Sequence, residues 1–153
     1  MQGNYRTTKF RGKRIDNGKW VSGSLIVSNF SYFIVVSVST FNASSTTLIS
    51  TMTYHEVHPE SVGECSGLKD KNGKEIYEGD IVKVRNGATT FESYFIGDVV
   101  FENAKFGYKA VKFEGSYPPH IPKKNSVVSL GTSEMIEIIG NIHEHSHLLE
   151  VQA

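Results

Sequence analysis

Apolar and polar residues alternate along most of this chain, in short runs rich in β-branched and aromatic residues with turn residues between them. Helical periodicity is scarce. Short strands at intervals of ~8–12 residues are typical of an all-β barrel or sandwich. The predicted strands are residues 19–27, 32–38, 46–52, 80–85, 89–96, 97–102, 108–114 and 136–142.

The turn residues agree with this interpretation. Asn-Gly pairs occur at Asn17-Gly18, Asn72-Gly73 and Asn86-Gly87, and both residue types tolerate the positive φ that tight hairpins require. The third pair predicts two strands joined by a two-residue turn. Residues 116–125 hold three of the four prolines and predict a loop, and a short helix is allowed at residues 126–130.

These elements predict an all-β fold with two lobes and at most one or two short helices. Residues 1–60 would form an N-terminal β-hairpin or meander lobe, and residues 61–153 a small SH3-like barrel lobe, together one compact unit. In the second lobe the stretch "EGDIVKV" has the form of a strand opening such a barrel, with a Gly bend and Val82 and Val84 facing inward.

Composition favours a soluble chain without oxidative cross-links. Sixteen basic and sixteen acidic residues give a formal net charge of zero, and the single cysteine, Cys65, cannot form an internal disulfide. The N-terminus lacks a signal-peptide pattern. The longest apolar run, residues 32–36, is far shorter than the ~20 residues that span a bilayer. We therefore expect a cytoplasmic protein without membrane association.

Charge is distributed unevenly. No Asp, Glu, Lys or Arg occurs from Val21 to His55, although exposed sheet edges are usually protected by charge, especially Lys. Two interpretations remain open: Ser and Thr supply the polar face of these strands, or another subunit covers them. The second predicts a homo-oligomer, with Ile34, Val36 and Val38 on the self-association strands.

The basic N-terminus raises the alternative of nucleic-acid binding, because small barrels often bind single strands through cations and stacking aromatics. Candidate contacts to nucleic acid or a partner are Lys9, Arg11, Lys13, Arg14 and Trp20. On an extended hairpin, Lys9, Arg11 and Lys13 share one face. The competing interpretation places Trp20 in the core, and the zero net charge argues against strong non-specific binding.

Catalytic chemistry finds little support, and we expect no catalytic residue and no cofactor. Cys65 lies in "GECSG", the pattern of a nucleophile elbow, but no helix is predicted after it. His143, His145 and His147 alternate and would share one face of a strand, so a zinc-dependent enzyme is a further alternative. Acidic residues at 75–80 are predicted to form a solvated rim.

Three segments carry a family resemblance. "KFRGKRIDNGKWVSG" (residues 9–23), "GLKDKNGKEIYEGDIVKV" (67–84) and "IEIIGNIHEH" (136–145) resemble, in order, the motifs of the YopX family of phage and prophage proteins. The chain departs from the family at His145-Ser146, where Asn-Pro is usual. The resemblance implies a β-rich fold and a phage or prophage source, and it brings no known activity.

The sequence thus predicts a non-enzymatic phage or prophage accessory protein of the host cytoplasm. It would act as a homo-oligomer and through contacts with an unidentified phage or host protein.

Overall fold

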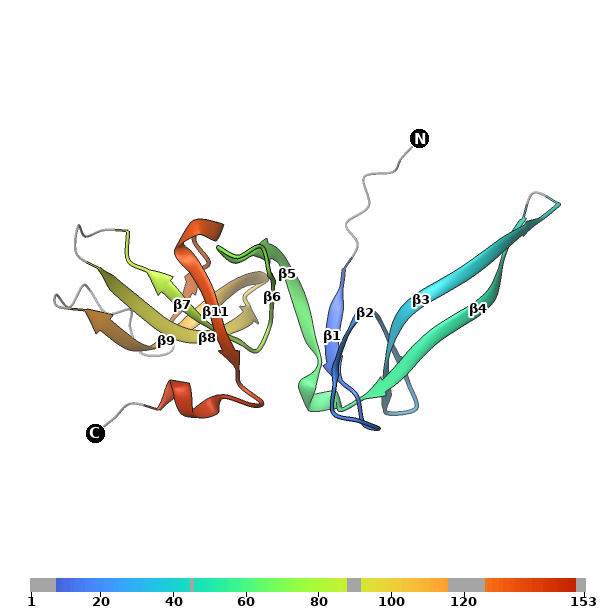
Figure 1. Ribbon diagram of the computed structural model, residues 1–153, viewed down its shortest axis with the longest axis horizontal. Helices are drawn as coiled ribbons and strands as arrows, with labels where there is room; N and C mark the ends of the chain where they lie inside the picture. Colours follow the sequence, from blue (N-terminus) through green and yellow to red (C-terminus); the bar gives the residue numbers. More distant parts are fainter. Residues whose placement is uncertain (1–7, 45, 88–91, 116–125, 151–153) are drawn as a thin grey trace. The chain divides into compact units, whose positions relative to one another are not determined.

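The computed structural model describes residues 8–44, 46–87, 92–115 and 126–150. The chain forms two compact units, Met1–Cys65 (unit 1) and Ser66–Ala153 (unit 2), where the sequence placed a boundary between residues 60 and 61. Figure 1 shows both units built from strands, so the predicted mainly β fold is confirmed. Helical structure in the described residues is limited to three 3-10 segments, Pro59–Ser61, Ser133–Met135 and Ser146–Leu149.

Unit 1 is an antiparallel sheet in the order β4-β3-β2-β1-β5. An isolated bridge between Arg14 and Val57 brings the end of the first strand to the end of the fourth, so the base of the sheet curls on itself. β5 pairs with β1 at Gly63 and Glu64 and then continues into unit 2. The strands are β1 (Phe10–Lys13), β2 (Trp20–Ser28), β3 (Ser31–Ala43), β4 (Thr46–Val57) and β5 (Gly63–Lys69).

The core of unit 1 is small and lies at the curled base. Ile34 and Val57 are fully buried there. A Cβ at Gly12 would lie 2.7 Å from a methyl group of Val57, closer than packed carbon atoms approach, so β1 reaches this core only because residue 12 has no side chain. The N-terminal motif around Gly12 therefore has a packing role.

Unit 2 contains a five-stranded antiparallel sheet in the order β10-β9-β8-β7-β11. Its buried cluster combines Val82 and Val84, as predicted, with apolar side chains from the other elements. Closure of this sheet into an SH3-like barrel stays a prediction. The strands are β6 (Glu75–Tyr77), β7 (Asp80–Arg85), β8 (Ser93–Glu102), β9 (Lys105–Gly115), β10 (Val127–Ser129) and β11 (Ile136–Asn141).

Two details of the predicted strands were wrong, and the structure assigns one segment that the sequence left open. The runs 89–96 and 97–102 are not separate strands, because residues 93–96 and 97–102 lie in one strand, β8, with a bulge between Ile96 and Gly97. Arg85 pairs with Tyr94 and the amide of Asn86 donates to the carbonyl of Ser93, so Asn86-Gly87 is not a two-residue turn between paired strands. Val127–Ser129 is a strand where a short helix was allowed. The predicted loop at 116–125 lies outside the described residues.

Within the part of the chain that the structure describes, no helix is long and apolar enough to cross a membrane.

Candidate functional site

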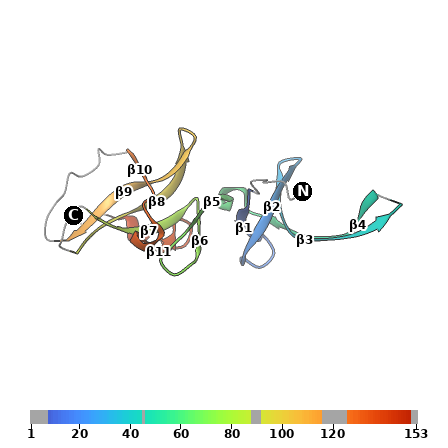
Figure 2. The ribbon, with the colours of Figure 1, turned by 90° about the horizontal axis from the view of Figure 1, so that it is seen from above.

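Beyond the base of unit 1, β3 and β4 continue as a two-stranded ribbon, which we call the arm (residues 36–43 and 46–54). Figure 1 and Figure 2 show the two strands extending together past the ends of β1 and β2. β2 pairs with β3 only from Ser24↔Val35 to Ser28↔Ser31, and β4 is the edge of the sheet. Two-stranded ribbons without a covering layer are marginally stable in water, so the arm is the least self-sufficient part of unit 1.

The two faces of the arm follow from the alternation along β4. Val57 is buried in the core, and Thr53 and Thr51 lie on the same side because residues i and i+2 of a strand share a face. We call this the core face. Tyr54 and Met52 lie on the opposite side, the outer face. The apolar side chains of the arm on the outer face therefore point away from the core of unit 1.

The register carries the same division to β3. Tyr54 pairs with Val35, and Met52 with Val38, on the outer face. After a bulge at Ser50, Ile49 pairs with Thr40 on that same face. The opposite face carries hydroxyls at Ser37, Ser39, Thr51 and Thr53 until Phe41 and Leu48 near the tip. We define the apolar patch of the arm as Val38, Ile49, Met52 and Tyr54.

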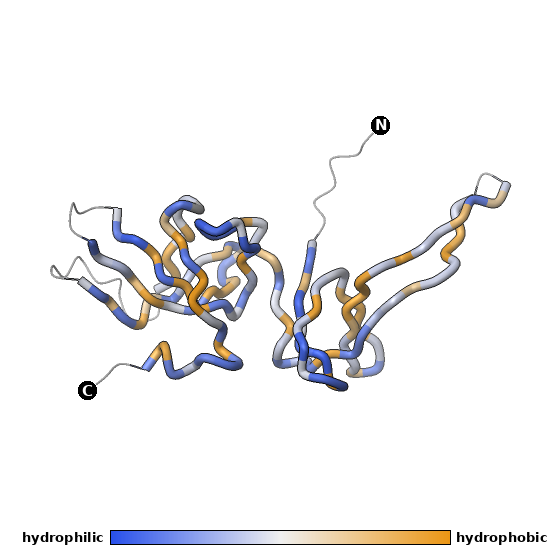
Figure 3. The backbone as a smooth tube through the Cα atoms, in the orientation of Figure 1, coloured by the Kyte–Doolittle hydropathy of each residue, from blue (hydrophilic) through white to orange (hydrophobic). Residues whose placement is uncertain are grey.

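This apolar patch is exposed. Ile49 is 66% and Tyr54 53% exposed, and Val38 and Met52 are also exposed. Figure 3 shows pale and apolar positions along most of both strands of the arm. The structure separates the three predicted association residues: Ile34 is a core residue, whereas Val36 and Val38 are exposed. A contiguous exposed apolar surface commonly marks an interaction site.

The basic N-terminal residues form a hairpin with β2. Arg11 pairs with Ser22 and Lys13 with Trp20, and the Arg11 guanidinium lies 4.9 Å from the centre of the Trp20 ring. Because Gly12 faces Val57, Arg11 and Lys13 share the opposite, outer face of the sheet.

The other predicted basic residues lie beside this hairpin. Arg14 makes an ion pair with Asp16 after β1 ends. Lys9 is partly buried just before β1, and its carbonyl accepts a hydrogen bond of 2.7 Å from the amide of Cys65. The five predicted contact residues thus lie on or next to the hairpin, with Arg11, Lys13 and Trp20 on its outer face.

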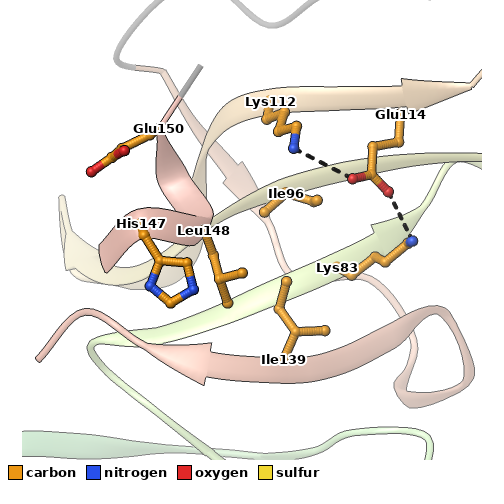
Figure 4. Close-up of a pocket in the computed structure, with 8 residues that line it drawn as sticks. All are labelled: Lys83, Ile96, Lys112, Glu114, Ile139, His147, Leu148 and Glu150. Atoms are coloured by element: carbon orange, nitrogen blue, oxygen red, sulfur yellow. Dashed lines mark hydrogen bonds and ion pairs between the residues drawn. The ribbon is translucent and has the colours of Figure 1, made fainter. Parts of the chain in front are cut away.

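A pocket of about 290 Å³ lies in unit 2 between the sheet and the last 3-10 segment (Figure 4). Ile96, Ile139 and Leu148 form its apolar part. At its polar end the carboxylate of Glu114 forms ion pairs with the amines of Lys83, at 2.9 Å, and Lys112, at 3.6 Å. The hydrogen bond from Lys83 lowers the pKa of Glu114 despite partial burial. Its cations are therefore already neutralised in part, and its lining residues include no Ser, Thr or Cys.

Asp70 stabilises the turn near the start of unit 2, and its side chain is buried, with 3% of the residue exposed. Its carboxylate accepts hydrogen bonds from the amides of Asn72 and Lys74, each 2.9 Å, and of Ile138, 3.2 Å. Burial raises the pKa of Asp70, but these backbone hydrogen bonds outweigh it and hold the pKa below its ordinary value. The amide of Lys71 also donates to the carbonyl of Ile136 at 2.9 Å. These hydrogen bonds therefore hold the turn that begins at Asp70 against β11, at Ile136 and Ile138.

The predicted solvated rim was wrong at Asp80. This residue is buried, and its carboxylate accepts a hydrogen bond of 2.9 Å from the amide of Tyr77. Glu75 accepts one of 2.8 Å from the Tyr77 hydroxyl. A short turn that must satisfy a buried amide explains why an acidic residue lies inside here. These carboxylates stabilise the bend before β7.

The histidine tail is not a strand, so the shared face that His143, His145 and His147 would have on a strand does not form. β11 ends at Asn141, whose side-chain oxygen accepts hydrogen bonds from the amides of His143 and Glu144, 3.0 Å each. These bonds turn the chain, and His147 lies in a 3-10 segment. Among the described residues, no group of three or more His, Cys, Asp or Glu side chains is placed to hold a metal ion.

Cys65 lies within β5 and is half-buried. The strand continues through the cysteine to Lys69, so the strand-to-helix turn of a nucleophile elbow does not form at this position.

One feature on the surface of unit 1 was missed. Phe30, in the turn between β2 and β3, is 97% exposed and has a φ of +67°, beside Asn29 at +49°. Such a backbone conformation costs a bulky residue roughly 1–3 kcal/mol. The sequence did signal a tight turn through Asn29 between two apolar runs, but it did not show that Phe30 would take the position that glycine prefers.

Comparison with known proteins agrees with this fold. The YopX family, described as YopX protein, matches residues 9–150. No curated protein is similar to the chain. The crystal structure of protein EF1440 from Enterococcus faecalis is similar in fold, with a TM-score of 0.59 and 21% sequence identity over 95% of this chain and 100% of that chain.

Proposed function

Because the chain belongs to the YopX family, and because its most exposed apolar strands are uncharged, we propose that it is a non-enzymatic phage or prophage accessory protein that acts through protein–protein contacts in the host cytoplasm. Self-association through the apolar patch of the arm is the first of these contacts. An unidentified phage or host protein would be the second partner.

The observation that carries this proposal is the orientation of the apolar patch. Its side chains lie on the outer face, so they cannot pack into the core of unit 1 as the strands are arranged. Burying one such side chain contributes roughly 1.5–3 kcal/mol. A second copy is a suitable cover because the stretch Val21–His55 carries no Asp, Glu, Lys or Arg side chain that would repel an identical surface. The zero net charge also leaves little overall repulsion between copies.

The test compares adjacent residues on the two faces of β4. Met52→Lys puts a charge on the apolar patch, and Thr51→Lys puts the same charge on the hydroxyl face one residue away. We expect the wild type to be a discrete oligomer by light scattering, Met52→Lys to be monomeric, and Thr51→Lys to associate like the wild type. A wild-type monomer at several hundred micromolar, or equal dissociation of both variants, would contradict self-association through this patch.

Nucleic-acid binding is the second candidate, favoured by the placement of Arg11, Lys13 and Trp20 on one face. The Arg11–Trp20 contact also fits a purely structural role, since the guanidinium already covers one side of the indole ring. The double change Arg11→Glu and Lys13→Glu should abolish any salt-sensitive binding to a labelled single strand, whereas Lys105→Glu in unit 2 should not. Absence of wild-type binding at low salt to both single strands and duplex would end this candidate.

A further inference from the structure

The turn between β2 and β3 presents an aromatic side chain that does not contribute to the core of unit 1. Ser28 pairs with Ser31, so Asn29 and Phe30 are the two central residues of a tight hairpin turn. Both have the positive φ that such a turn requires. Asn and Gly suit these positions, whereas Phe is strained there. An almost fully exposed aromatic on a strained backbone does not stabilise this unit, which points to a contact outside it.

A groove of about 530 Å³ opens on the outer face of the same unit, where β3 separates from β2. Ser22, Gly23 and Ser24 line its β2 side, and Val35, Val36 and Val38 its β3 side. The small residues of β2 leave room beside the valine side chains of β3. The groove is thus a slot at the base of the arm that combines these valines with the polar residues Thr8, Lys9 and Ser37, and it is continuous with the apolar patch through Val38.

We propose that Phe30 of one copy seats in this groove of a second copy, so that identical chains associate head to tail. This inference rests on the proposed self-association and specifies its geometry. Phe30 and the groove are different surfaces of one unit, so their pairing is heterologous and lets a further copy add at each end unless a ring closes. Lys9, which also lines the groove, supplies a cation for contact with the aromatic ring.

A lipid membrane is the competing partner for Phe30, because an exposed aromatic residue at a hairpin tip can insert into a membrane. Ile26 and Val27 are also exposed nearby. Segments that bind membranes in this way usually combine apolar side chains with Lys or Arg, which attract anionic headgroups. No such cation occurs from Val21 to His55. The groove offers valine side chains to the ring and, in Lys9, one cation for its face, and therefore fits Phe30 better than an anionic membrane does.

The experiment uses the full chain with a variant of each surface. Phe30→Gly removes the aromatic ring and suits the positive φ, and Ser24→Glu places a charge in the groove. Ser39→Glu, on the hydroxyl face of the arm, is the matched control. Sedimentation velocity across a concentration series should show at least tenfold weaker association for Phe30→Gly and for Ser24→Glu, and wild-type association for Ser39→Glu.

Mixing the two weakened variants gives the decisive measurement. Phe30→Gly retains an intact groove and Ser24→Glu retains Phe30, so a 1:1 mixture should form a heterodimer of wild-type affinity that does not grow further. The urea midpoint of Phe30→Gly should be higher than that of the wild type, because its backbone strain is relieved. A higher midpoint with weaker association excludes misfolding as the cause.

Three results would overturn the inference. The first is wild-type association of Phe30→Gly; in that case Met52→Lys still decides whether the arm mediates self-association. The second is failure of the two folded variants to form a heterodimer. The third is co-sedimentation of the wild type, but not of Phe30→Gly, with vesicles of phosphatidylcholine and phosphatidylglycerol, which would assign Phe30 to a membrane.

Discussion

The two units use their apolar residues in opposite ways. In unit 2 the branched side chains of β7, β8 and β11 meet in one buried cluster that includes Val82, Val99 and Ile136. In unit 1 Ile34 and Val57 are buried at the base, while the longest strands, β3 and β4, present an exposed apolar patch. Since both units are antiparallel sheets, the difference is one of which face the apolar residues occupy. Unit 2 buries most of these side chains in its own core, whereas unit 1 leaves apolar side chains of the arm exposed.

The comparison is tested most strongly by truncating one isoleucine in each unit. Ile136 is 0% exposed, so Ile136→Ala should cost about 2–5 kcal/mol of unfolding free energy through lost burial and a cavity. Ile49→Ala, on the arm, should change it by about 0.5 kcal/mol or less when measured at a concentration where the chain is monomeric. Urea denaturation followed by circular dichroism measures both. Equal losses at the two sites would show that the arm is packed as tightly as the core.

The alternation of apolar residues predicted the core of unit 2 well but the arm poorly. Val82 and Val84 were assigned to the interior from their alternation with Lys83, and they are buried. The predicted runs 32–38 and 46–52 are shorter than β3 and β4, because apolar and polar residues do not alternate in the Ser- and Thr-rich ends of these strands. Pairing between the two strands, which is a long-range property, determines their true length.

The orientation of individual arm residues also depends on pairing. Ile34, Val36 and Val38 have the spacing of one strand face, and yet Ile34 is buried whereas the other two are exposed. A bulge between Val35 and Ser37 reverses the face on which later residues of β3 lie. The local sequence gives no signal for this bulge. The exposure of Phe30 was hidden for a similar reason, since a positive φ at a non-glycine residue arises from the hairpin as a whole.

A buried polar anchor in unit 2 gives the second test. Asp70→Asn keeps the shape of the side chain but removes one acceptor and the negative charge from the amides of Asn72, Lys74 and Ile138. Loss of charged hydrogen bonds of this kind should cost about 2–3 kcal/mol. Asp16→Asn in unit 1, where the carboxylate is exposed and pairs with Arg14, is the matched control and should leave the denaturation midpoint unchanged.

The pH dependence of Asp70 has a definite sign. Its pKa is lowered in the folded state, so its stabilising contribution is complete above the unfolded-state pKa of about 3.9 and is lost as pH falls through the lower folded value. Wild-type stability should therefore fall more steeply than that of Asp70→Asn in this acidic range. Parallel pH profiles for the two proteins would show that the carboxylate is not the charged anchor of the turn.

The smallest expected effect concerns the ion pairs at the pocket of unit 2. Glu114 is half-exposed, so Glu114→Gln should cost less than about 1 kcal/mol at low salt, and the difference should shrink in 0.5 M salt. The pKa of Glu114 is lowered by its hydrogen bond with Lys83, so this contribution is present above its unfolded pKa of about 4.3 and fades as pH falls through the folded value.

Salt-dependent urea denaturation of Glu114→Gln therefore tests whether the pocket is only a surface feature of a self-contained unit. Gln cannot neutralise Lys83 and Lys112, but both amines remain partly solvated and can recover water as a partner. A loss above 2 kcal/mol that persists in high salt would mean that the carboxylate is integral to the fold. Unit 2 would then depend on charged side chains at its surface as well as on its apolar core. The two units would in that case differ in electrostatics as well as in the placement of their apolar residues, because the arm of unit 1 carries no charge.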